Sequence, residues 1–136
     1  MGAWAADSFG NDTACDWAYA LEDCKDISLV EDTLDKVLSC GDNYLDSSDA
    51  TEAIAAIEVI ARLQGNWGIR NAYSESVDKW VKKKKLVPTK ELAEKAHKVI
   101  ARILADDSEL KELWQDSALS DEWLASVKEL ASRVKL

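Results

Sequence analysis

Apolar side chains recur at every third or fourth position along most of the chain, which is the spacing of one face of an α-helix. Stripes of this kind run through residues 14–21, 27–38, 53–63, 73–81, 92–103, 110–114 and 123–134. The sequence shows neither the alternation typical of a β-strand nor an internal repeat. The pattern therefore predicts an all-α fold, a bundle of six or seven short antiparallel helices without a sheet.

Short sequence signals mark several ends of these stripes. Gly41 and Gly65 follow the second and third stripes, and glycine often ends a helix in the left-handed conformation. Asp49 stands three residues before a glutamate, which predicts a capping box at the start of the third helix. Thr89 follows a proline and predicts the start of the helix over 92–103.

The stripe over 53–63 is the most apolar of the chain and predicts the central helix. Only Glu58 and Arg62 interrupt it. Glu58 either shares a thin exposed stripe with Arg62, one turn further on, or is buried with a specific cationic partner. We favour the simple pair because both residues follow the same stripe.

The composition is that of one soluble domain over residues 1–136. The chain is 47% apolar and 32% charged, and no linker divides it. Its longest apolar runs fall short of the roughly 20 residues that cross a membrane, and the N-terminal residues lack the pattern of an export signal. Three cysteines without a C-x-x-C pair favour a reducing compartment, so we expect a cytoplasmic protein.

Charge is distributed unevenly along the chain. Residues 1–60 carry 14 acidic side chains and 2 lysines, whereas residues 61–136 carry 12 acidic and 15 basic ones. A net charge of −9 disfavours nucleic acid and anionic membranes and favours a basic protein partner, although acidity can also serve solubility alone. The candidate partner-binding carboxylates are Asp23, Asp26, Glu31, Asp32 and Asp35.

A basic run, KWVKKKK, occupies residues 79–85. Its members form the candidate basic patch: Lys79, Lys82, Lys83, Lys84 and Lys85. The run could contact an acidic partner or a phosphate, with Trp80 as a stacking surface. The interpretation we favour is a solvated helix end or a counterpart to the acidic first half.

Sequence motifs for catalysis or metal binding are incomplete. His97 is the one histidine, and with Glu94 it makes a single Glu-x-x-His, whereas a di-metal helical site needs two. We therefore predict no catalytic residue, no metal ligand and no cofactor. The question of an enzyme stays open, and we favour a non-enzymatic role.

The first 17 residues, MGAWAADSFGNDTACDW, carry a specific pattern. They resemble the start of a bacterial family known as domain of unknown function 4259, whose members begin MGAWG, then F, then ND, then A-x-DW. The resemblance continues through AIAAIEVIA and DSELKELWQD, and it departs at Ala5, where the family has glycine. It implies a small cytoplasmic helical domain and lends no catalytic residue.

An opening fixed in this way suggests an anchored N-terminal cap over residues 1–12. Aromatic side chains among small residues need a packing partner. We expect Trp4 and Phe9 to pack beside Trp17, and the α-amino group or a nearby donor to meet Glu58.

Three classes of function remain open. The leading hypothesis is a small acidic protein-binding module, an adaptor or an immunity-type protein, acting through the carboxylates of the first half. The alternative is an enzyme or small-ligand binder that uses Asp12, Asp16 and Glu58 near the opening motif. The third is a structural or regulatory homo-oligomer with an exposed apolar patch.

Overall fold

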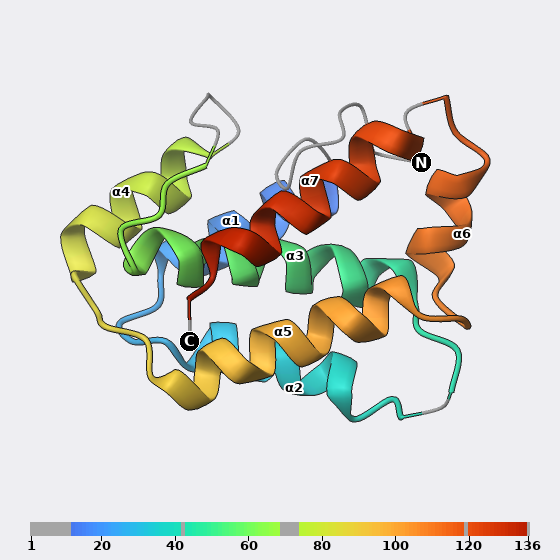
Figure 1. Ribbon diagram of the computed structural model, residues 1–136. Helices are drawn as coiled ribbons and strands as arrows, with labels where there is room; N and C mark the ends of the chain where they lie inside the picture. The colour runs from blue at the N-terminus through green and yellow to red at the C-terminus, as the bar shows by residue number, and fades with distance from the viewer. Residues whose placement is uncertain (1–11, 42, 69–73, 119, 136) are drawn as a thin grey trace.

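The computed structural model describes residues 12–41, 43–68, 74–118 and 120–135, which fold into helices without a β-strand, as Figure 1 shows. The helices in these residues are α1 (Asp12–Glu22), α2 (Ser28–Leu38), α3 (Ser47–Leu63), α4 (Glu75–Lys84), α5 (Lys90–Leu104), α6 (Glu109–Gln115) and α7 (Ser120–Arg133). This confirms the predicted all-α fold. Within the described ranges, none of the helices combines the length and apolar character needed to cross a membrane.

Helix α3 is the central element of the fold. It packs against each of the other helices, and α2 and α5 run in the opposite direction beside it (Figure 1). Every residue of α3 from Ala53 to Arg62 is buried, so the helix is surrounded on all sides. The prediction of a central helix from its apolar composition is confirmed.

Several predicted helix ends are also confirmed, but one is wrong. Gly65 directly follows the C-cap of α3 and has a positive φ angle of 88°, and the Thr89 side chain accepts a hydrogen bond from the Leu92 amide at 3.1 Å. Gly41 also has a positive φ angle, of 57°, but it lies two residues beyond Ser39, the C-cap of α2. Asp49 does not cap α3. Asp46 does, accepting from the amide of Ser48.

Helix α3 begins after Asp46 rather than after Asp49 because of Leu45, the residue before Asp46. Leu45 is held in an isolated parallel bridge to the segment before α6: its amide donates to the Asp107 carbonyl at 2.7 Å, and its carbonyl accepts from the Glu109 amide at 3.0 Å. Arg102 fixes the same two segments by donating to four backbone carbonyls, those of Gly41, Asn43, Asp106 and Asp107. After this bridge the backbone is extended at Asp46, and the helix begins at Ser47. Asp49 therefore lies inside the helix and not at its cap.

Tryptophan side chains tie neighbouring helices together. Trp17 is 4% exposed and donates to Thr33 Oγ1 at 2.9 Å, joining α1 to α2. Trp114 and Trp123 stack with ring centroids 6.0 Å apart, joining α6 to α7. Trp80 donates to the Cys24 carbonyl at 3.0 Å. Each of these indoles thus packs in the core, and the ring N–H groups of Trp17 and Trp80 find the hydrogen-bond partner that a buried donor requires.

Candidate functional site

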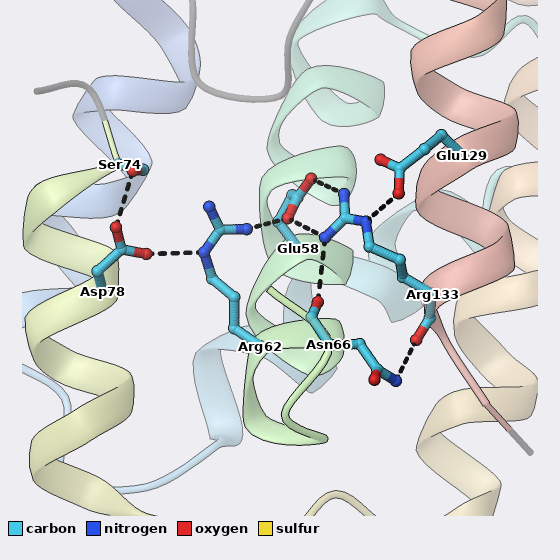
Figure 2. Close-up of polar contacts among 7 residues, drawn as sticks. All are labelled: Glu58, Arg62, Asn66, Ser74, Asp78, Glu129 and Arg133. Carbon is cyan, nitrogen blue, oxygen red and sulfur yellow. Dashed lines mark hydrogen bonds and ion pairs between the residues drawn. The ribbon is translucent and has the colours of Figure 1, made fainter. Parts of the chain in front are cut away.

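Four charged side chains meet inside the bundle and form a buried charge cluster: Glu58 and Arg62 of α3, Asp78 of α4 and Arg133 of α7 (Figure 2). Their side chains are between 1% and 13% exposed. The cluster contains two acidic and two basic groups, so its formal charge is balanced. Buried charges are stable only when paired in this way.

Glu58 lies at the centre of the cluster. The Arg133 guanidinium binds both of its carboxylate oxygens, with Nη2 2.5 Å from Oε1 and Nη1 3.0 Å from Oε2. Arg62 Nη1 contacts the same Oε2, and Arg62 Nε donates to Asp78 Oδ1 at 2.7 Å. The ion pairs therefore run from α7 through α3 to α4.

Polar groups around the cluster satisfy its remaining donors and acceptors. Ser74 donates to the other oxygen of Asp78 at 2.9 Å, and Asn66 exchanges two hydrogen bonds with Arg133, through the Asn66 carbonyl and the Arg133 carbonyl. Glu129 accepts from Arg133 Nε at 2.5 Å. Burial lowers the pKa of Arg133, but hydrogen bonds to Glu58 and Glu129 outweigh it and hold the pKa above its ordinary value.

The interpretation that we favoured for Glu58, a simple pair with Arg62 on a thin exposed stripe, was therefore wrong about exposure. The predicted pair with Arg62 forms, but both residues are buried, and Glu58 has a further cationic partner 75 residues away. Trp17 is buried as expected. Trp4, Phe9 and residues 1–11 of the predicted cap lie outside the described residues, so the packing of the cap and its contact with Glu58 remain predictions.

The candidate partner-binding carboxylates all lie on the surface. Asp26 accepts from the amide and the hydroxyl of Ser28 at the start of α2, and the hydroxyl contact, followed by the amide, lowers the pKa of Asp26. Asp35 accepts from Lys95 at 2.7 Å. The other three belong to no ion pair within the described part of the chain: Asp23, Glu31 and Asp32. These carboxylates, which lie on α2 and in the segment between α1 and α2, therefore keep unneutralised charge.

The candidate basic patch covers the last turns of α4. Lys79 pairs with Glu75 at 2.9 Å, Lys83 is exposed and Lys84 is half-buried. Trp80 is only 4% exposed and cannot serve as a stacking surface. The aromatic ring beside the lysines is that of Trp67, with Lys82 Nζ 5.9 Å from its centroid, a neighbour that sequence order did not indicate.

A pocket of about 370 Å³ opens beside this patch. Its lining comes from the end of α3, the segment after it, the end of α4 and the connection to α5: Arg62, Leu63, Gly65, Trp67, Val81, Lys82, Lys85, Leu86 and Val87. The lining is mainly apolar, with lysines among it. The pocket was not predicted, because its walls come from segments that are distant in the sequence.

The alternative carboxylate site near the opening motif gains no support from these positions. Asp16 is exposed on α1, Glu58 is buried in ion pairs, and neither lines the pocket. The third candidate, the side chain of Asp12, lies outside the part of the chain that the structure describes. The described ranges contain no group of three or more His, Cys, Asp or Glu side chains placed to hold a metal. His97, half-buried on α5, contacts the Val134 carbonyl through Nε2 at 2.8 Å, which ties α5 to the end of α7.

Fold and charge cluster together define an all-α domain whose C-terminal helix is joined to its central helix by buried ion pairs. Residues 2–126 match the family described as "Domain of unknown function (DUF4259)". The chain belongs to this family, as its opening residues predicted. No curated protein and no solved structure matches the chain.

Proposed function

We propose that this domain is a cytoplasmic protein-binding module, of adaptor or immunity type, that recognises a basic protein through its acidic face. The acidic face comprises Asp23, Asp26, Glu31, Asp32 and Asp35. The observation that carries the proposal is that Asp23, Glu31 and Asp32 are exposed and belong to no ion pair in the described residues. Such carboxylates attract a complementary surface and raise its association rate.

The position of the face on the fold supports this use. Helix α2 packs on α3 and α5 through a buried side of Val30, Leu34 and Val37, so its acidic residues project from a rigid element. Rigid elements lose little conformational entropy on binding. An acidic surface also disfavours contact with nucleic acid and anionic membranes.

The test removes charge from the face without changing the fold. In the variant D23N/E31Q/D32N, three exposed carboxylates become neutral. We expect affinity capture from the native host to lose a basic protein that the unchanged chain retains, and we expect that capture to weaken as salt rises.

A matched control distinguishes the loss of charge at the acidic face from the loss of net charge alone. The variant E94Q/D116N/D121N removes the same charge from exposed positions on or near α5, α6 and α7 and should retain the partner. Equal loss in both variants, equal retention in both, or capture that is insensitive to salt would each contradict the proposal.

A further inference from the structure

The pocket between α3 and α4 has the features of a ligand site that is independent of the acidic face. Ligand pockets in proteins measure about 300 to 1,000 Å³, and this one, at about 370 Å³, falls at the small end of that range. It is large enough for one aromatic ring or a short aliphatic chain.

The walls of the pocket are apolar and partly in contact with solvent. Trp67 and Leu86 are half-buried, and Val87 is 87% exposed. Exposed apolar side chains that line one pocket leave surface that a bound apolar group would cover. The apolar walls therefore favour a ligand that carries a hydrocarbon group.

Two of the charged side chains in the lining are lysines, Lys82 and Lys85. Lys82 lies over the Trp67 ring at 5.9 Å, and Lys85 ends α4 in the left-handed conformation with φ of 51°. Glycine usually occupies such a position, but at Lys85 the chain places a cation at the pocket. Within the described residues, neither lysine belongs to an ion pair.

Arg62 does not add to this positive charge. It also lines the pocket, with its guanidinium 5.8 Å from the Trp67 centroid, but its charge is balanced by Glu58 and Asp78. Its role at the pocket is to fix one side of the Trp67 ring. The charge available to a ligand comes from Lys82 and Lys85.

We propose that this pocket binds a small amphipathic carboxylate, with its ring or aliphatic chain against Trp67, Val81 and Leu86 and its carboxylate between Lys82 and Lys85. The complementarity is twofold: the apolar walls cover part of the hydrocarbon surface, and the lysines offset the carboxylate charge. A neutral or cationic compound with the same hydrocarbon gains only the first contribution, and a short carboxylate gains only the second.

The probe is octanoate, titrated into the full-length ¹⁵N-labelled chain. The Trp67 indole N–H signal, assigned with Trp67→Phe, and the backbone amides of residues 81–87 should shift together and saturate. Octylammonium and 1-octanol should bind at least about tenfold more weakly, a difference of about 1.4 kcal/mol. Acetate should produce no saturable shift of these signals.

Paired variants test the cations. K82Q/K85Q should weaken octanoate binding about tenfold, whereas K83Q/K90Q, which removes the same charge from exposed positions outside the lining, should leave it unchanged. Equal binding of the three octyl compounds, shifts centred on other residues, no saturable shift, or an equal effect of both variants would overturn the proposal.

Discussion

Arg133, the last residue of α7, binds both carboxylate oxygens of Glu58, which lies 75 residues earlier in the middle of α3. A two-point contact of planar groups fixes orientation as well as distance. It sets the position of α7 on α3, while the Arg62 to Asp78 pair does the same for α4. Three helices are thus held in register by one balanced set of charges.

Arg133→Met should destabilise the fold strongly. The methionine fills part of the space, but the cluster keeps two carboxylates against one guanidinium. Loss of one partner from a buried pair costs about 3–5 kcal/mol, and we expect a reduction of this size in the free energy of unfolding measured with urea.

The control for this variant is Lys79→Met, which breaks the exposed pair with Glu75. Exposed pairs of this kind contribute about 0–1 kcal/mol. Similar costs for the two variants would show that the Arg133 pair is not the fixed, buried contact that the geometry describes.

Gly68→Ala should disturb the same cluster. A methyl group at Gly68 would lie 2.6 Å from Arg133 Nη1, and the guanidinium cannot move away without weakening its bonds to Glu58 and Glu129. We expect a loss of about 1–3 kcal/mol, as for other overpacked sites, measured by the same unfolding titration.

A double-variant cycle tests the cause. In a chain that already carries Arg133→Met, the flexible methionine can yield, so the cost of Gly68→Ala should fall by more than half. An equal cost in both backgrounds would place the effect in the backbone of residue 68 and contradict the proposed clash.

The fold was largely predictable because its main determinant is local. Apolar spacing gave every helix from α1 to α7, and Thr89 and Gly65 marked ends correctly, since caps depend on residues a few positions apart. The cap of α3 was mispredicted because Asp46 and Asp49 are chemically equivalent candidates. The choice between them depends on Leu45, which is held by a segment more than 60 residues away.

The charge cluster and the pocket could not be predicted in the same way. Glu58 stood out because it interrupts an apolar helix. Asp78 and Arg133 each sit next to a buried apolar residue, Val77 and Val134, at the edge of a stripe where charged residues are normally exposed. Only the packing of α4 and α7 onto α3 turns those edges inward, and helix packing is not encoded in spacing along one chain segment.

Glu52→Gln should stabilise the protein at neutral pH. Burial raises the pKa of Glu52, Asp49 and Asp46 add to the rise, and Lys36 opposes it. The folded chain therefore holds this proton more tightly than the unfolded chain, and the ionised form that prevails at neutral pH is the less favourable one in the fold. The protonated Glu52 side chain contributes to stability at a pH below its pKa in the unfolded chain. This contribution is lost as the pH rises from that value through the higher pKa of the folded chain.

The measurement for Glu52→Gln is the melting temperature as a function of pH. The variant should melt higher than the unchanged chain at neutral pH, and the difference should shrink as the pH falls toward about 4. Glu94→Gln, at an exposed position of α5, is the control. A pH-independent difference, or a lower melting temperature for Glu52→Gln at neutral pH, would contradict this account.

Ser108→Ala should be neutral or stabilising, although Ser108 is the N-cap of α6. Its side chain makes no capping hydrogen bond, and its buried Oγ has no hydrogen-bond partner in the described residues. Removing an unsatisfied buried hydroxyl relieves a desolvation cost of about 1–3 kcal/mol, partly offset by lost packing.

Thr89→Ala is the matched control, because Thr89 does cap its helix and its loss should cost about 1 kcal/mol. If unfolding titrations gave the two variants the same loss of stability, the Ser108 hydroxyl would have to form a hydrogen bond in solution. A loss of stability in Thr89→Ala alone would support the view that the backbone bridge between Leu45 and Ser108, rather than a side-chain cap, begins α6.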